Sequence, residues 1–138
     1  MTTSRAAAVW EGGLKDGKGT FKAGSSAFGG GYTFATRFES APGTTPEELI
    51  AAAHAACFSM ALSADLEKAG TPAARIETSA ACTIDGGRIQ TMELSVRGRV
   101  QGIDQAAFRK AAEGAKENCP VSKALKGNVV FVLDARLE

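Results

Sequence analysis

An apolar segment in the first half of the chain constrains the fold more than any other feature. Between Leu49 and Ala64 the only polar residues are His54, Ser59 and Ser63. A helix that is apolar on nearly every side is buried in a large core or between subunits. One chain of 138 residues can hardly cover such a helix all round, and its many alanines let another backbone approach closely. The segment therefore predicts a homodimer packed around this helix.

Both ends of this helix carry recognisable signals. Thr45 suits the N-cap, Pro46 the first helical position and Glu48 the third, which together form a capping box. Gly70 marks the end, because glycine readily adopts the left-handed conformation that closes a helix.

The first 40 residues predict strands separated by glycine-rich turns. "AAAVWEG" and "GTFKAG" are the first two candidates, at residues 6–12 and 19–24. "YTFATRFE", residues 32–39, alternates polar and apolar side chains and predicts a third strand, with Tyr32, Phe34, Thr36 and Phe38 on one face.

The second half predicts two more strands, two helices and a closing strand. In residues 75–85 and 88–102, apolar and polar side chains alternate, so each strand has one buried face. Residues 105–118 have alanine and Phe108 at helical spacing after a cap at Asp104. "CPVSKAL" predicts a short helix, and residues 128–138 a final strand. This order of elements predicts a single α+β domain over residues 1–138.

Composition excludes several classes of function. Sixteen basic and fifteen acidic residues give a net charge of +1 without a long basic tract, so no nucleic-acid partner is expected. The N-terminus lacks the apolar region of a signal peptide, and no uninterrupted apolar stretch is as long as a membrane span. Three widely spaced cysteines and one histidine do not suit a disulfide scaffold or a zinc site. We expect a cytoplasmic protein without membrane, metal or cofactor binding.

The three cysteines differ in what their surroundings predict. Cys82 lies mid-strand on the apolar face between Ala80 and Ile84, and is interpreted as structural. Cys119 precedes Pro120, so it is either the N-cap of the short helix, where a thiolate is favoured, or merely the end of the preceding helix. Local sequence does not decide between these alternatives.

Cys57 lies inside the apolar helix, and its role is equally open from periodicity. His54 lies three residues earlier on the same face, so a cysteine–histidine pair is possible, although a lone histidine on a buried helix is more often a hydrogen-bonded core residue. Arg37, in the predicted strand before the helix, is an alternative activator of the thiolate.

Two motifs resemble a known family. "RFESAPGTTPEELIAAAHAACFSMAL", residues 37–62, and "NCPVSKALK", residues 118–126, strongly resemble the OsmC/Ohr family of thiol-dependent peroxidases, and its osmotically inducible protein C branch more than its organic hydroperoxide resistance branch. "VWEG" and "GKGT" near the start and "GID" before the helix at 105–118 extend the resemblance over nearly the whole chain.

The resemblance implies a fold and a mechanism. It implies an antiparallel sheet wrapped around a buried central helix, in an intertwined homodimer. Cys57 would be the peroxidatic cysteine, Cys119 the resolving cysteine, and Arg37 and Glu47 the residues around the thiolate. An organic hydroperoxide would be reduced to an alcohol, hydrogen peroxide less well, through a sulfenic acid and an intramolecular Cys57–Cys119 disulfide. An external dithiol, of the lipoyl type, would restore the thiols.

Two other functions compete with this one. A hydrolase would use Cys57 as nucleophile and His54 as base and would need no Cys119. A dimeric protein that binds hydrophobic ligands would have inert thiols. Neither explains the "CPVS" motif.

Overall fold

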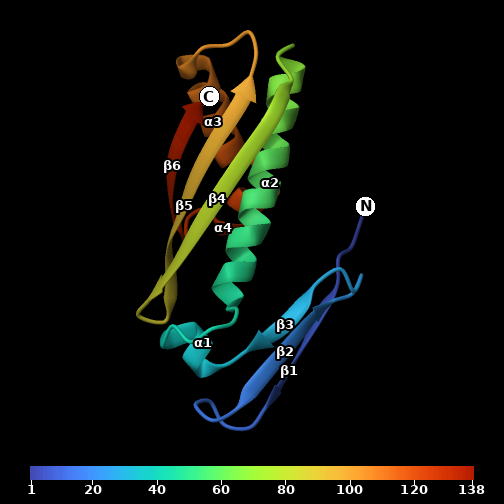
Figure 1. The fold of residues 1–138 in the computed structure, drawn as a ribbon, viewed down its shortest axis with the longest axis vertical. Coiled ribbons are helices and arrows are strands. Elements are labelled where there is room, and N and C mark those ends of the chain that lie inside the picture. Colours follow the sequence, from blue (N-terminus) through green and yellow to red (C-terminus); the bar gives the residue numbers. More distant parts are fainter. The chain divides into compact units, whose positions relative to one another are not determined.

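The computed structural model describes residues 1–138. It divides into two compact units, Met1–Leu49 and Ile50–Glu138, which are described in turn (Figure 1). The elements mix helices with sheets, as the sequence predicts. That the whole chain is one domain stays a prediction.

The first unit is built on an antiparallel sheet of three strands in the order β1-β2-β3. β1 is Ala6–Glu11, β2 is Lys18–Ala23 and β3 is Gly29–Tyr32, so the first two predicted strands are confirmed. Trp10, Gly19 and Tyr32 lie side by side on the three strands. The Trp10 and Tyr32 rings lie 5.6 Å apart, and a Cβ at Gly19 would come within 2.7 Å of both. Glycine at this position therefore allows the two rings to approach each other.

The predicted strand over residues 32–39 is wrong beyond Tyr32. Thr33 is the N-cap of a short helix, α1 (Phe34–Phe38), and it exchanges hydrogen bonds with Thr36 in a capping box. The alternation that predicted a strand also places Phe34 and Phe38 four positions apart in the sequence, which is the spacing of neighbours on a helix. In α1 the centres of their rings lie 5.0 Å from each other. Arg37 is therefore on a helix and not on a strand.

The long apolar segment forms α2, Pro46–Lys68. Its N-cap is confirmed, because the Thr45 hydroxyl accepts the Glu48 amide at 2.9 Å. The Glu48 carboxylate accepts a hydrogen bond from Thr44 at 2.7 Å. The helix closes at Gly70, which has a φ of +83°. Thr45, Pro46 and Gly70 thus mark the ends of this helix as the sequence predicts, whereas the Glu48 carboxylate of the predicted capping box bonds to the Thr44 hydroxyl instead of the Thr45 amide.

Within one chain, α2 is buried along one side only. Phe58, Leu62 and Leu66 pack into the core of the second unit, whereas Met60 is 76% exposed. Contrary to the expectation from sequence, α2 is long and apolar enough to cross a membrane by length and composition. This finding rests on length and composition alone, and the apolar stripe of α2 described above packs into the core of the second unit.

The sheet of the second unit has the order β4-β5-β6. β4 (Ala73–Asp85) and β5 (Arg88–Val100) form an antiparallel hairpin. β6 (Val130–Leu137) joins β5 in parallel, so this sheet is mixed rather than wholly antiparallel. The parallel pairing follows from the connection, because two helices, α3 (Gln105–Asn118) and α4 (Pro120–Leu125), lie between β5 and β6.

One face of this sheet carries the core. The alternation predicted for β4 and β5 is confirmed, with Met92, Leu94 and Val96 fully buried. They share a cluster with the buried side of α2 and with Phe108 of α3. Figure 1 shows α2 running alongside the sheet. This packing holds the apolar helix, and with it Cys57, against a rigid support.

Candidate active site

Cys119 lies at the junction of α3 and α4, where it both ends one helix and begins the next. Its amide donates to the Ala115 carbonyl at 3.0 Å and closes α3. Its Sγ accepts the Ser122 amide at 3.3 Å and caps α4, with Pro120 in the first turn. The two alternatives left open by the sequence are therefore both true. The side chain is fully buried.

Cys57 lies on α2, half-buried, beside Cys119 and Val121. Burial raises the pKa of the Cys57 thiol, a hydrogen bond from the Val121 backbone lowers it, and the neighbouring Cys119 thiol raises it. No disulfide joins the two cysteines. The fold thus makes neighbours of two thiols that are distant in sequence.

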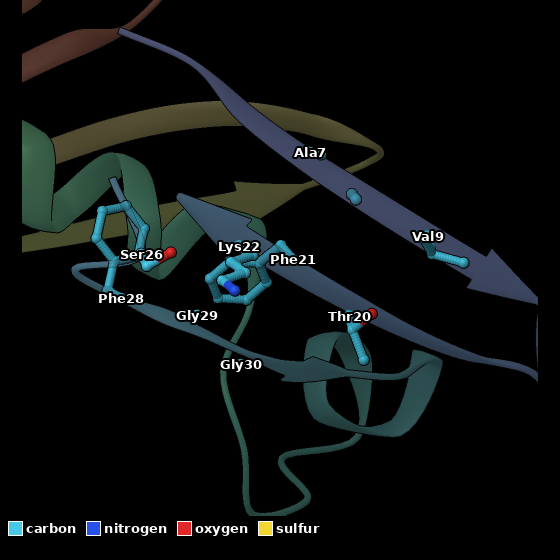
Figure 2. Close-up of a pocket in the computed structure, with 10 residues that line it drawn as sticks. Ala7, Val9, Thr20, Phe21, Lys22, Ser26, Phe28, Gly29 and Gly30 are labelled. Carbon is cyan, nitrogen blue, oxygen red and sulfur yellow. The ribbon is translucent and has the colours of Figure 1, made fainter. Parts of the chain in front are cut away.

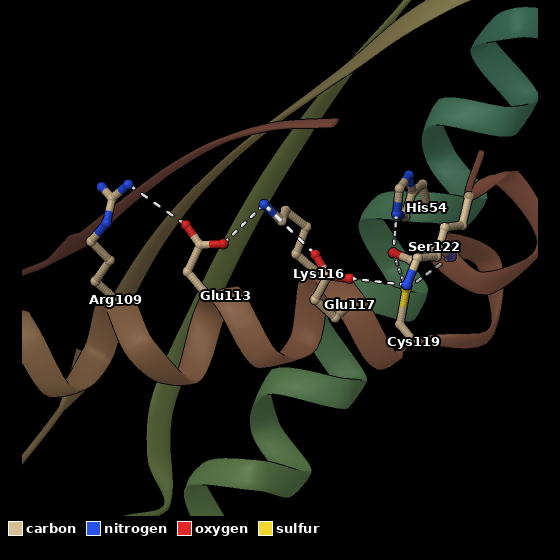
Figure 3. Close-up of polar contacts among 8 residues, drawn as sticks. His54, Arg109, Glu113, Lys116, Glu117, Cys119 and Ser122 are labelled. Carbon is tan, nitrogen blue, oxygen red and sulfur yellow. Dashed lines mark hydrogen bonds and ion pairs between the residues drawn. The ribbon is translucent and has the colours of Figure 1, made fainter. Parts of the chain in front are cut away.

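A chain of hydrogen bonds leads from Cys119 into the core (Figure 3). The Ser122 hydroxyl lies 3.0 Å from Cys119 Sγ and 2.7 Å from Nε2 of His54. His54 is fully buried, and the Phe131 ring stands edge-on to it at 5.2 Å. Burial lowers the pKa of the imidazole. His54 is therefore bonded to the serine beside the second thiol, as a core histidine, and not paired with Cys57 as a hydrolase would require.

Arg37 and Glu47 form an ion pair within the first unit. Arg37 Nη2 lies 2.6 Å from Glu47 Oε1, and Nε lies 3.0 and 3.3 Å from the two carboxylate oxygens. The Glu47 side chain is only 6% exposed, against 37% for Arg37. The four predicted site residues are thus brought together as two pairs, one in each unit.

Cys82 lies on β4, directly opposite Met92 of β5. It is half-buried and packs against the core of the second unit, as its place in the strand predicts.

A cavity of about 500 Å³ lies on the sheet of the first unit (Figure 2). Its walls include Val9, Thr20, Phe21 and Phe28, and Lys22 is the one ionisable residue among them. It has no thiol, so it does not contain the chemistry described above. No group of three histidine, cysteine or acidic residues is placed to hold a metal ion.

Sequence reasoning missed Ser122 and Val121 as parts of the site. The signal for Ser122 was present, because it is the third residue after Cys119, the spacing at which an N-cap side chain meets a backbone amide. Nothing in the sequence pattern pointed to its second bond, with a histidine 68 positions away.

Comparison with known proteins gives one consistent family. The model of the OsmC-like protein family matches residues 39–134. The chain is 45% identical to peroxiredoxin OsmC of Escherichia coli K12 over 129 residues, 90% of each protein. It is 36% identical to the organic hydroperoxide resistance protein of Xanthomonas axonopodis pv. citri over 95 residues, 66% of each.

Solved structures agree on the fold. A crystal structure of an organic hydroperoxide resistance protein OsmC from Legionella pneumophila superposes with a TM-score of 0.74 at 21% identity, covering 99% of this chain and 98% of the other. The organic hydroperoxide resistance protein OhrB of Bacillus subtilis gives a TM-score of 0.66 at 25% identity, with coverages of 95% and 97%. These likenesses confirm the fold predicted from the two cysteine motifs.

Proposed function

The chain belongs to the OsmC-like protein family, and on that premise we propose that it is a thiol-dependent peroxidase that reduces organic hydroperoxides to alcohols. The relatives are named for peroxiredoxin activity and organic hydroperoxide resistance. The observation that carries the proposal is that the Cys119 thiol neighbours the Cys57 thiol and raises its pKa. A half-buried thiol on an apolar helix suits a substrate that is itself largely apolar.

The reaction proceeds in two thiol steps. The Cys57 thiolate attacks one peroxide oxygen, the O–O bond breaks, and the alkoxide leaves as an alcohol after taking up a proton. Cys57 is left as a sulfenic acid. The Cys119 sulfur then attacks the Cys57 sulfur, an S–S bond forms and water is lost. Fast condensation protects Cys57 from irreversible over-oxidation. An external dithiol of the lipoyl type reduces the disulfide and closes the cycle.

Arg37 supplies the positive charge in this scheme. Burial raises the pKa of the Cys57 thiol, so the thiolate needs a cation to offset the loss of hydration. The guanidinium stabilises the thiolate and polarises the peroxide, while Glu47 holds the guanidinium in place through the ion pair. The same charge then serves both the nucleophile and the bond that breaks.

Helix geometry supports a site shared between two subunits. Glu47 and Cys57 are ten residues apart on the continuous α2, which corresponds to about 15 Å along the axis. A carboxylate cannot span that distance to serve the thiolate of its own helix. In a homodimer with antiparallel α2 helices, the Arg37–Glu47 pair of one subunit lies near Cys57 of the other. The exposed apolar residues Val9, Trp10, Phe28 and Met60 support such an interface.

The proposal is tested by activity assays with matched variants. We expect the wild type to consume cumene hydroperoxide faster than hydrogen peroxide, and to turn over with a dithiol better than with a monothiol. Cys57→Ser should abolish turnover, because a hydroxyl at neutral pH is a far poorer nucleophile than a thiolate. Cys119→Ser should still oxidise once and hold a sulfenic acid at Cys57, detectable by mass spectrometry.

Two outcomes would point to the competing functions. Thioester hydrolysis that survives Cys119→Ser, without peroxide consumption, would indicate a hydrolase. Slow alkylation of Cys57 together with no peroxide consumption would indicate a binding protein.

A further inference from the structure

We propose that Ser122 and His54 form a proton relay that deprotonates Cys119 for its attack on oxidised Cys57. This inference rests on the proposed peroxidase function and assigns its second step a base. The two bonds that carry it are the 3.0 Å contact of Ser122 Oγ with Cys119 Sγ and the 2.7 Å contact with His54 Nε2. Figure 3 shows the three side chains in line.

The hydroxyl of Ser122 has one proton to donate and two lone pairs to accept with. In the relay it donates to His54 Nε2 and accepts the S–H proton of Cys119. The serine backbone adds a separate contact, because its amide donates to Cys119 Sγ at 3.3 Å. The bond from that amide to Cys119 Sγ is enough to cap α4. The cap therefore does not explain why a hydroxyl and an imidazole also lie beside Cys119.

His54 is kept in the form that accepts a proton. It is fully buried, and burial lowers its pKa, so the ring is neutral at physiological pH. With Nε2 receiving the serine hydroxyl, the ring proton lies on Nδ1, which is buried without a hydrogen-bond partner. The free lone pair of the ring is therefore on Nε2, which faces the Ser122 hydroxyl and can receive a proton from it.

In the second step, Cys119 loses a proton and displaces the oxygen of the sulfenic acid at Cys57. The Cys119 proton moves to Ser122 Oγ while the serine proton moves to His54 Nε2. The Cys119 sulfur attacks the Cys57 sulfur, the S–S bond forms, and the S–O bond of the sulfenic acid breaks. The sulfenic oxygen leaves and takes up the proton that His54 passes back through Ser122, so the net products are a disulfide and one water. Ser122 touches the reacting sulfur, and His54 acts through it as a positioning residue.

Single-turnover kinetics test the relay with three variants. Ser122→Ala breaks the chain, His54→Gln keeps a hydrogen-bonding side chain without a basic nitrogen, and Ser59→Ala is the control. Ser59 is another hydroxyl on α2, and it bonds to Ala55 and Thr78. Reduced protein is mixed with one equivalent of cumene hydroperoxide and quenched at intervals with dimedone. Mass spectrometry then measures the sulfenic acid at Cys57 and the disulfide separately.

The relay predicts a selective and pH-dependent defect. Oxidation of Cys57 stays within about twofold of wild type in all variants, which also shows that they are folded. Disulfide formation at pH 7 slows at least about tenfold in Ser122→Ala and His54→Gln, in the range of lost acid–base catalysis, and is unchanged in Ser59→Ala. Towards pH 10 the deficit shrinks, because hydroxide then replaces the relay as the base. Disulfide formation at wild-type rate, or a deficit equal at every pH, would overturn the relay.

A peroxide-free measurement separates this inference from the proposed function. In a Cys57→Ser/Cys82→Ala background, Cys119 is the only thiol, and thiolate absorbance at 240 nm reports its ionisation. Once Cys119 is ionised, the Ser122 hydroxyl can turn and donate to the thiolate, so the relay predicts that adding Ser122→Ala shifts this titration to higher pH. Coincident titrations would refute the relay even if the enzyme is active. A wild type whose Cys57 is never oxidised would refute the proposed peroxidase function. A shifted titration would still support the relay in that case.

Discussion

The guanidinium of Arg37 holds the carboxylate of Glu47 through two nitrogens, Nη2 at 2.6 Å and Nε at 3.0 Å from Oε1. Both residues belong to the same chain, and the acid is almost fully buried. A charge-assisted pair of this kind acts as one unit. Whichever subunit provides the acid to a thiolate therefore provides the arginine too.

Mixed dimers give the first prediction. Cys57→Ser and Glu47→Ala subunits are each inactive as homodimers, because one lacks the nucleophile and the other the residue that holds Arg37. In a mixed dimer, Cys57 of one chain meets an intact Arg37–Glu47 pair of the other. Random mixing in equal amounts should restore roughly a quarter of the wild-type sites in a symmetric dimer. Arg37→Ala in place of Glu47→Ala should restore the same fraction. Mixed dimers confirmed by native mass spectrometry but without peroxidase activity would argue for a site within one chain.

The second prediction concerns the pH dependence of stability. Burial lowers the pKa of His54 below its ordinary value of 6.5, so the unfolded chain binds this proton more readily than the folded one. His54 should contribute stability in full above about pH 6.5 and lose it as the pH falls towards the folded pKa. Urea unfolding at pH 8 and pH 5 should show a larger loss for wild type than for His54→Gln. The ring resonances of this single histidine should give the folded pKa directly. An equal loss in both proteins would mean that the histidine is not buried as described.

The third prediction concerns Cys82. Because its side chain packs from β4 against the core and lies opposite Met92, Cys82→Ala should leave peroxide turnover unchanged. The loss of a half-buried sulfur should lower the free energy of unfolding by about 1 kcal/mol or less. Steady-state assays and urea denaturation measure the two effects. A large fall in kcat with normal stability would give Cys82 a place in the chemistry.

The fourth prediction compares two glycines of the second unit. A Cβ at Gly98 of β5 would overlap the Phe108 ring, whereas a Cβ at Gly114 in α3 would make only an ordinary contact with Asp65. Gly98→Ala should destabilise the protein by about 1–3 kcal/mol through overpacking. Gly114→Ala should stabilise it by about 0.5–1 kcal/mol, because alanine is the better helix former. Thermal unfolding measures both changes, and a Gly98→Ala variant that unfolds at or above the wild-type temperature would mean that α3 does not pack on β5 as described.

Local sequence rules predicted the elements whose signals lie close together in the chain. Thr45, Pro46 and Gly70 mark the ends of α2 because capping depends on a few neighbouring residues. The same rules failed at Phe34–Phe38, because Phe34 and Phe38 fit both the alternation of a strand and the four-residue spacing of a helix. The capping box between Thr33 and Thr36 selects the helix.

The site was less accessible to sequence reasoning. The family motifs located both thiols, and "CP" indicated a helix start at Cys119. The parallel pairing of β6, and the bond between His54 and Ser122, depend on how α3 and α4 return the chain to the sheet. Periodicity describes one element at a time, so contacts of that range lie outside what it can predict.

Disulfide mapping tests whether Cys57 and Cys119 are the two thiols that peroxide joins. Reduced protein is treated with one equivalent of cumene hydroperoxide, blocked with an alkylating agent, digested without reduction and examined by mass spectrometry. We expect the dominant cross-linked peptide to join Cys57 to Cys119 within one chain, with Cys82 recovered in alkylated form. A dominant disulfide that contains Cys82, or a Cys57 that stays alkylatable after peroxide, would rule out the proposed pairing of peroxidatic and resolving thiols.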